Sequence, residues 1–184
     1  MEPHRPQHGQ HDQHGQHGLT LVEAAVVLAI VAITTTSAAP GFQRLIDRYR
    51  LDAAATQFAA DLQLARNESI ARNRVVRLSW HAASACYLLH TGPAEACGCD
   101  ADGQAHCTPG STPIRSVAWG SGARVSLQSN TASIAFDPLH GTATPTATWR
   151  IALGDGRAIH HVINVMGRVR SCSPLAGVAG YHPC

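Results

Sequence analysis

The sequence contains no lysine, because all 14 of its basic residues are arginine. Aromatic residues make up only 5% of the chain, so alanine, glycine and valine must do much of the apolar packing. The formal net charge of +2 is too small to identify a nucleic-acid-binding protein by itself. A hydrophobic content of 45% nevertheless suffices for a packed core and excludes a disordered chain. At 184 residues the chain has room for one ordinary domain and an additional segment.

Motifs that carry catalysis in other proteins are also missing. The sequence has no G-x-S-x-G, Walker A, H-E-x-x-H or paired-carboxylate pattern. Its serine, aspartate and histidine residues show no spacing that is typical of a nucleophile and a base. We therefore predict that the protein is not an enzyme and that it needs no cofactor.

Cysteine is absent before position 86, and all six cysteines follow in the rest of the chain, at Cys86, Cys97, Cys99, Cys107, Cys172 and Cys184. An even number of cysteines in an exported domain predicts disulfides. The ligand types in Cys97-Gly98-Cys99 and His106-Cys107 are also those of a zinc site, but zinc sites have a wider cysteine spacing. We favour disulfides and no metal, and the spacing alone leaves their connectivity open.

Two unusual segments open the chain. Residues 1–18 are polar, with histidine at every third position from His8 to His17. Such a tract could bind metal, or be low-complexity filler or the remnant of a tag, and we favour filler. Leu19–Phe42 then carries Glu23 as its single charge. As a helix this run would measure roughly 36 Å, enough for a hydrocarbon layer of about 30 Å.

Three interpretations of the apolar run compete. A plain membrane anchor explains its length but not Glu23. A conventional secretory signal would be cut after the small residues 37–39, but Pro40 would then follow the cut directly and Glu23 would lie in the apolar region. The third interpretation explains all of these features, and it rests on a resemblance.

The stretch Gly18-Leu19-Thr20-Leu21-Val22-Glu23 resembles the prepilin signature of type IV pilins and type II secretion pseudopilins. The resemblance implies that a prepilin peptidase cuts between Gly18 and Leu19 and methylates the new amine of Leu19. Leucine here departs mildly from the usual phenylalanine. Pro40 and Gly41 fall where pilins commonly bend this helix.

The resemblance also implies a role for Glu23, which is to pair with the N-terminal amine of a neighbouring subunit during filament assembly. An ionised carboxylate costs about 2.5–3.5 kcal/mol at the centre of a membrane and less near an edge. A charge retained in such a segment therefore indicates a functional residue.

Helical patterning resumes after Pro40 and continues to about Arg72. One narrow, mostly apolar stripe has steps of three or four residues and consists of Leu51, Ala55, Phe58, Leu62, Ala65 and Ser69. We expect the other side of the helix to carry Asp47, Arg48, Asp61, Arg66 and Glu68.

The pattern then changes to strands. Runs with strand character lie at 74–80, 86–90, 114–119, 124–128, 133–136, 146–153 and 158–166. Clusters of Gly, Pro, Asn and Asp separate them, and Gly154-Asp155-Gly156 predicts a hairpin turn. We therefore predict an α+β fold in which antiparallel sheet follows one long helix. We expect Trp119 and Trp149 to pack in the core or at its edge, and His160-His161 to point to opposite faces of a strand.

Two further segments, Ala65–Asn73 and Ile163–Cys172, resemble the GspH/FimT family of minor pilins and pseudopilins. This resemblance implies a type IV pilin-like fold with a cleaved leader at 1–18, a transmembrane and assembly helix at 19–42, an amphipathic continuation at 43–73 and a periplasmic β-rich domain at 74–184. It also implies a Cys172–Cys184 disulfide that closes a C-terminal loop, with local pairing among the other four cysteines.

Gly167-Arg168-Val169-Arg170 is the best candidate for a DNA contact. If the segment leaves the sheet in an extended form, Arg168 and Arg170 point the same way and could bind successive phosphates. Arg150 and Arg157 would extend the patch. In FimT-like minor pilins a motif of this kind is associated with DNA capture during natural transformation. The alternative is that these arginines pair with acidic residues or flank a disulfide loop.

The resemblance thus implies a minor type IV pilin in the bacterial inner membrane, with other pilins and a prepilin peptidase as partners and double-stranded DNA as a candidate ligand. A pseudopilin of a type II secretion system is the alternative within the same fold. A secreted, disulfide-rich enzyme with a conventional signal is the third class, and a mature chain that begins near Pro40 would favour it.

Overall fold

The computed structural model describes residues 20–120, 122–174 and 177–184, so the predicted cleavage residues Gly18 and Leu19 lie outside the described residues. The chain divides into two compact units, residues 1–42 and 43–184. We describe each unit by itself.

One helix, α1 (Leu21–Arg72), belongs to both units. Thr20 precedes it, and the Thr20 hydroxyl accepts a hydrogen bond from the backbone N–H of Glu23 at 3.2 Å. Thr-x-x-Glu is the sequence of a capping box, in which side chains satisfy N–H groups that the first turn of a helix leaves unpaired. The cap explains why the helix begins at Leu21.

In the first unit α1 is apolar and fully exposed. Among the described residues it is the one helix that is long and apolar enough to cross a membrane. The hydroxyls of residues 34–37 donate to carbonyls three or four residues earlier in the helix, so these polar groups are satisfied within it. Pro40 lies inside the helix and Gly41 follows it, and the bend predicted there stays a prediction.

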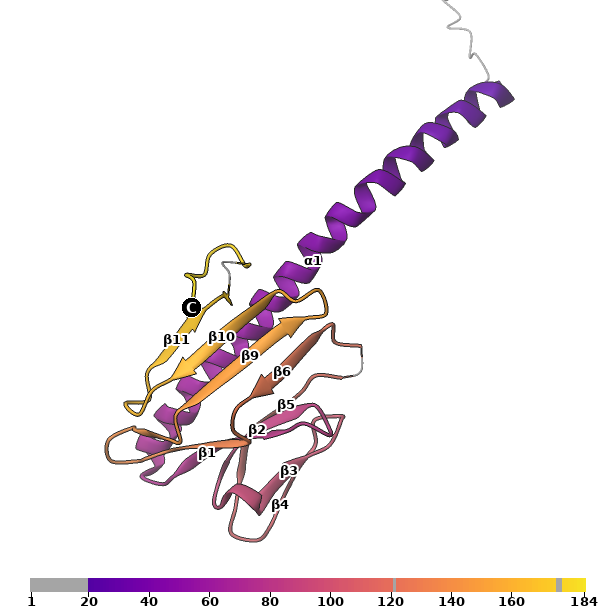
Figure 1. Ribbon diagram of the computed structural model, residues 1–184. Helices are drawn as coiled ribbons and strands as arrows, with labels where there is room; N and C mark the ends of the chain where they lie inside the picture. The colour runs from indigo at the N-terminus through magenta and orange to yellow at the C-terminus, as the bar shows by residue number, and fades with distance from the viewer. Residues whose placement is uncertain (1–19, 121, 175–176) are drawn as a thin grey trace, which may run out of the picture. The chain divides into compact units, whose positions relative to one another are not determined.

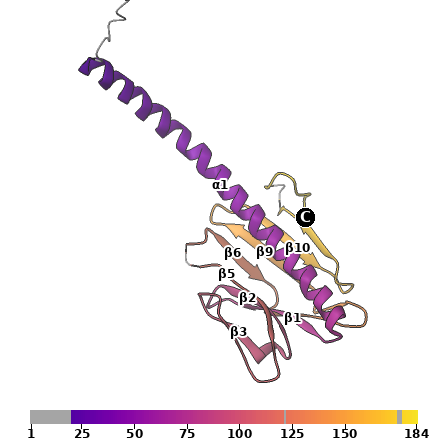
Figure 2. The ribbon, with the colours of Figure 1, turned by 180° about the vertical axis from the view of Figure 1, so that it is seen from behind.

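In the second unit α1 packs one face against β-sheet (Figure 2). All six residues of the predicted apolar stripe are buried, which confirms the stripe. The ring of Phe58 lies at its centre, with ring centroids 5.0 Å from Tyr87 and 5.2 Å from Trp149. These large side chains form the core between the helix and the sheets.

The prediction that Asp61 lies on the polar side of the helix is wrong. Asp61 is buried, and its carboxylate accepts hydrogen bonds from the Tyr87 hydroxyl at 2.7 Å and from Gln57 at 3.1 Å. The guanidinium of Arg115 lies 3.1 Å from Oδ1 of Asp61, the carboxylate oxygen that does not bind Tyr87. Burial, together with the negative charge of Asp61, raises the pKa of Tyr87. A buried charge is tolerated here because it is both paired and hydrogen-bonded.

Within the described part of the chain, the strands form two larger antiparallel sheets and one hairpin (Figure 1). The five-stranded sheet consists, in spatial order, of β5 (Pro113–Ala118), β2 (Cys86–Thr91), β1 (Val76–His81), β7 (Ser133–Phe136) and β8 (Ala143–Thr144). The four-stranded sheet consists of β11 (Val169–Cys172), β10 (Ala158–Ile163), β9 (Ala147–Leu153) and β6 (Val125–Ser129). The hairpin consists of β3 (Cys97–Cys99) and β4 (Ala105–Cys107), and the 3-10 helix η1 (Ala94–Ala96) precedes it.

Each predicted run corresponds to a strand with shifted or equal ends, and the predicted turn at residues 154–156 joins β9 to β10. Strands β3, β4, β8 and β11 were not predicted. The condition considered for Gly167–Arg170, an extended segment that leaves the sheet, is not met from Val169 onward, because β11 pairs there with β10 as an edge strand of the four-stranded sheet.

We call residues 94–107 the disulfide flap. It packs against Cys86 and Leu88, on the face of the five-stranded sheet that α1 does not cover. Cys86–Cys99 ties the flap to β2, and Cys97–Cys107 joins β3 to β4. All four cysteines are therefore paired locally, which leaves no thiolate for the alternative zinc site.

The third disulfide, Cys172–Cys184, is the pairing that the resemblance implied. It closes the C-terminal segment back onto β11, where the backbone N–H of Ser173 also donates to the carbonyl of His182 at 2.9 Å. The loop is bonded to α1 as well, because the Tyr181 hydroxyl donates to Asp52 at 2.7 Å.

Candidate functional site

The turn between β10 and β11 positions the arginine motif. The backbone N–H of Gly167 donates to the carbonyl of Asn164 at 2.9 Å, and the backbone N–H of Arg168 donates to the side chain of Asn164 at 3.0 Å. Beyond the turn, Val169 pairs with Ile163 and Arg170 with Val162. The asparagine therefore fixes the point at which the chain reverses, directly before the first arginine.

Gly167 is required by backbone geometry at this turn. Its φ of 69° is left-handed, and a Cβ atom there would collide with the carbonyl oxygen of Gly141 in the β7–β8 loop. The same carbonyl accepts a hydrogen bond from Nε of Arg66 in α1 at 2.9 Å. Helix, loop and turn thus meet at one carbonyl, and the glycine of the motif has a structural role.

Arg170 lies in β11 and Arg168 directly precedes it, and both are exposed. The backbone N–H of Asn164 donates to the Arg168 carbonyl and continues the β10–β11 pairing, so these alternate residues lie on the same side. No acidic side chain among the described residues pairs with either guanidinium. Within the described residues, therefore, these two arginines do not form the ion pairs that the alternative interpretation predicts. Two uncompensated positive charges remain on the edge strand of the four-stranded sheet.

Arg150 lies on β9, two strands away from the motif, and pairs in register with His160 of β10. Its guanidinium donates to the Gln128 side chain at 3.1 Å, so it keeps its charge uncompensated. Burial, and secondarily the positive charge of Arg150, lowers the pKa of His160. At neutral pH this face of the sheet therefore carries Arg150, Arg168 and Arg170 as cations, and a neutral His160.

Arg157 does not belong to this group. It follows the 154–156 turn, at the end of the β9–β10 hairpin opposite to the motif. Its guanidinium is 2.7 Å from the carboxylate of Asp155, and this contact raises the pKa of Arg157 and lowers that of Asp155. The prediction that Arg157 extends the patch is not supported by this geometry, because its charge is neutralised locally.

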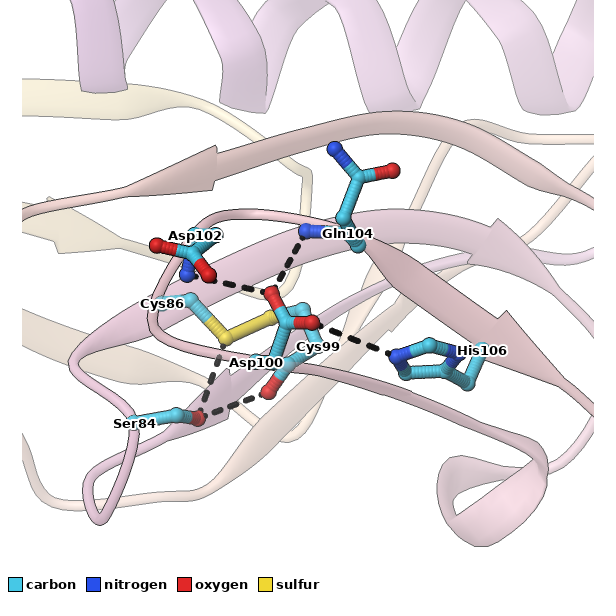
Figure 3. A network of polar contacts seen from close by, with 7 residues as sticks. All are labelled: Ser84, Cys86, Cys99, Asp100, Asp102, Gln104 and His106. Carbon is cyan, nitrogen blue, oxygen red and sulfur yellow. Dashed lines mark hydrogen bonds and ion pairs between the residues drawn. A yellow bond between two sulfur atoms is a disulfide. The ribbon is translucent and has the colours of Figure 1, made fainter.

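The flap contains aspartate and histidine, and Ser84 lies beside it in the β1–β2 turn, but these side chains do not form a catalytic arrangement (Figure 3). The Ser84 hydroxyl donates to the carbonyl of Cys99 at 2.7 Å, whereas His106 contacts Asp100 at 3.4 Å. The backbone N–H of Gln104 donates to Asp100, which is the main reason why the pKa of Asp100 is lowered. These contacts shape a turn, and no group of metal-ligating side chains occurs among the described residues.

The remaining predicted side chains lie as expected. Trp149 is fully buried, and Trp119 is partly buried with its ring centroid 6.1 Å from that of Tyr87. His161 is buried, and its Nδ1 shares a hydrogen bond with the Ser171 hydroxyl at 2.9 Å. His160 is half-buried on the other face of the strand. Glu23 is exposed in the first turn of α1.

Comparison with known proteins identifies the family. A model described as type II transport protein GspH matches residues 54–167, which is more than half of the chain. The chain belongs to the GspH family. A second model, described as a prokaryotic N-terminal methylation motif, matches residues 13–39. None of the curated proteins matches the sequence.

Solved structures that match this chain include those of a minor pilin and a minor pseudopilin. One crystal form of the type IV minor pilin FimU from Pseudomonas aeruginosa is 20% identical and covers 71% of this chain and 97% of its own, with a TM-score of 0.53. A second crystal form of FimU is also 20% identical, covers 68% of this chain and 98% of its own, and has a TM-score of 0.50. The minor pseudopilin EpsH from the Vibrio cholerae type 2 secretion system is 12% identical and covers 68% and 98%, with a TM-score of 0.49.

The likeness to FimU confirms the predicted fold, one long N-terminal helix followed by antiparallel sheets. Pilins and pseudopilins are structural proteins, which confirms that this member of the GspH family is not an enzyme. The methylation motif implies processing by a prepilin peptidase, and the family implies other pilins as partners.

Proposed function

We propose that this member of the GspH family is a minor subunit of a type IV pilus that binds DNA through Arg168 and Arg170. In this proposal α1 anchors the protein in the bacterial inner membrane, the β-rich domain faces the periplasm, and a prepilin peptidase releases residues 1–18 by cutting between Gly18 and Leu19. The observation that carries the DNA-binding proposal is the exposure of two arginines without acidic partners on one side of β11.

The spacing of the two arginines suits a nucleic-acid backbone. Alternate residues of a strand lie about 6.6 Å apart, and each guanidinium can donate two parallel hydrogen bonds to a phosphate. Arg150 adds a third cation on the same sheet face. A contact made mainly with phosphates gives weak binding without sequence preference.

Binding to duplex DNA at two salt concentrations tests this proposal, with the mature full-length protein in detergent. For two phosphate contacts, we expect the affinity to fall about tenfold between roughly 50 and 200 mM salt. Arg168→Ala/Arg170→Ala should abolish the binding. Arg124→Ala/Arg157→Ala is a charge-matched control, because it removes two arginines that are paired with Asp47 and Asp155. Equal affinity of the motif variant and the wild type would reject the DNA contact.

A pseudopilin of a type II secretion system is the second candidate, and the description of the matched family favours it. Such a subunit would help to build a short periplasmic filament and would not need to bind DNA. Absence of DNA binding at low salt would leave the assembly role in place and favour the pseudopilin.

The assembly role rests on Glu23, which we propose pairs with the N-terminal amine of a neighbouring subunit. The backbone N–H of Glu23 donates to the Thr20 hydroxyl whatever the side chain, and a Glu23 carboxylate that accepts from the backbone N–H of Thr20 would complete a capping box, which is a purely structural alternative. Two variants separate these roles, because glutamine can serve in a capping box but carries no charge. We expect Glu23→Ala and Glu23→Gln both to insert and fold normally and to be lost from purified filaments. Normal incorporation of the glutamine variant would show that the cap, and not the charge, is needed.

A further inference from the structure

The start of the second unit carries cations that the protein itself does not neutralise. Arg44, Arg48 and Arg50 are exposed, and Asp47 is the one acidic residue between positions 43 and 50. Asp47 already lies 3.7 Å from Arg50 and 3.4 Å from Arg124. A single carboxylate thus serves two other guanidinium groups, and among the described residues neither Arg44 nor Arg48 has an ion pair. The next acidic residue, Asp52, accepts a hydrogen bond from the Tyr181 hydroxyl.

The contacts of these two arginines confirm this imbalance. Arg44 has no ion pair or side-chain hydrogen bond among the described residues, and Arg48 donates to the carbonyl oxygen of Ala179 at 3.2 Å. That carbonyl carries no net charge. In contrast, Arg72 at the other end of the same helix pairs with Glu68.

The position of the arginines in the chain places them next to the apolar segment. That segment ends at Phe42, so Arg44 follows two residues later. In a helix with a rise of about 1.5 Å per residue, Arg44 lies about 3 Å and Arg48 about 9 Å beyond Phe42. Headgroups add about 5–7 Å to each side of a hydrocarbon layer of about 30 Å. Arg44 thus falls within the headgroup layer, and the long side chain of Arg48 can reach back to it.

Two exposed apolar side chains accompany the arginines. Leu45 is 45% exposed and Tyr49 is 67% exposed, although both are large enough to stabilise a core if they were buried. Tyrosine is enriched where a membrane protein crosses the headgroup region. Exposed apolar residues interspersed with arginines are therefore typical of a segment that lies at the membrane–water interface.

We propose that residues 44–50 bind the phosphodiester groups of anionic phospholipids at the membrane surface, chiefly through Arg44 and Arg48. This inference rests on the membrane anchoring proposed above and adds a preference for lipid class. The cavity beside Arg48, with a volume of about 320 Å³, is a poorer phosphate site because it also contains the carboxylate of Asp52.

The test uses the mature full-length protein in vesicles of nine parts phosphatidylethanolamine and one part phosphatidylglycerol. Lipids retained after mild detergent extraction are quantified by native mass spectrometry. Wild type should retain phosphatidylglycerol above its share in the vesicle, and Arg44→Gln/Arg48→Gln should lower the retained ratio of phosphatidylglycerol to phosphatidylethanolamine, by up to about fivefold for each arginine. Arg44→Lys/Arg48→Lys should keep most of it, and Arg72→Gln/Arg74→Gln, on or directly after the same helix, should keep all of it.

Resistance to alkaline extraction, measured on the same vesicles, separates this inference from the anchoring on which it rests. A protein that stays inserted but retains the two lipids in their vesicle ratio would overturn the lipid preference alone. Enrichment that persists unchanged in the glutamine variant would also overturn it. Removal of the wild type by alkali would overturn the anchoring and the preference together.

Discussion

The domain of this protein holds itself together in two different ways. Where α1 meets the sheets, Phe58, Tyr87, Phe136 and Trp149 are fully buried, and no disulfide joins the helix to a strand. The disulfide flap buries only small side chains, such as Ala96, and relies on Cys86–Cys99 and Cys97–Cys107.

The difference follows from composition. With aromatic residues at 5% of the chain, there are few aromatic side chains to distribute, and those that are fully buried gather in one cluster. Burial of apolar area stabilises by about 25 cal/mol per Å², so a flap of alanine, glycine and cysteine gains little from it. Disulfides act mainly by restricting the unfolded chain and do not need a large buried area. We therefore expect the core and the flap to respond to different perturbations.

The largest expected effect is that of Phe58→Ala in the helix-packed core. Removal of a buried phenylalanine costs about 3–5 kcal/mol, against a total stability of about 5–15 kcal/mol for an ordinary domain. Gln63→Ala on the exposed side of the same helix is the control and should change the unfolding free energy by less than about 0.5 kcal/mol. Chemical denaturation measures both. Similar losses for the two variants would mean that this core does not carry the stability.

A second, more local effect is expected when the flap loses a disulfide. Cys97–Cys107 spans 10 residues, and disulfides of this kind contribute about 2–4 kcal/mol. In Cys97→Ser/Cys107→Ser we expect the amides of β3 and β4 to exchange hydrogen rapidly while those of β9 and β10 keep their protection. Hydrogen exchange followed by mass spectrometry reports both regions. Equal loss in β9 would show that the flap and the core unfold as one unit.

Mild acid should destabilise the core, whereas loss of the Cys97–Cys107 disulfide should destabilise the flap. Burial lowers the pKa of His161 from 6.5 to about 4, so below pH 6.5 the unfolded chain binds a proton that the folded chain does not. The stability of the core therefore falls as the pH drops from 6.5 towards 4, by about 2–3 kcal/mol at most. Burial lowers the pKa of His90 as well and acts in the same direction.

In the flap, by contrast, the disulfides do not titrate, and hydrogen bonds lower the pKa of Asp100 from its ordinary value. Unfolding free energies at pH 7.5, 5.5 and 4.5 give the expected slope. His161→Gln, which can still hydrogen-bond to Ser171, should flatten it. A slope that is unchanged in this variant would assign the acid sensitivity to other groups.

Much of the fold could be predicted because apolar periodicity reports directly on burial. The stripe from Leu51 to Ser69 and the strands that follow α1 were recognised in this way. Asp61 was misplaced because a carboxylate signals an exposed position, and its partners Tyr87 and Arg115 are distant in the sequence. Strands β3 and β4 were missed because Cys-Gly-Cys has no alternation, and disulfides rather than apolar side chains tie them in place.

The arginine surface was predictable only in part. Alternation along a strand placed Arg168 and Arg170 on one side whether or not β11 belonged to the sheet. That Arg157 does not belong to the arginine surface could have been predicted, because its partner Asp155 lies two residues earlier in a turn that was itself predicted. The structural need for Gly167 had no signal in the sequence, because the carbonyl of Gly141 that it meets lies in the β7–β8 loop of the other sheet.

The central claim is that the chain is a processed filament subunit of the GspH family, and the mass of its mature N-terminal peptide tests this most directly. Protein purified from membranes of cells that contain a prepilin peptidase should begin at Leu19 and carry one methyl group on its amine. A catalytically inactive peptidase should leave residues 1–18 in place. A mature chain that begins near Pro40 would contradict the account, because it would indicate a conventional signal sequence and a secreted protein without its assembly helix.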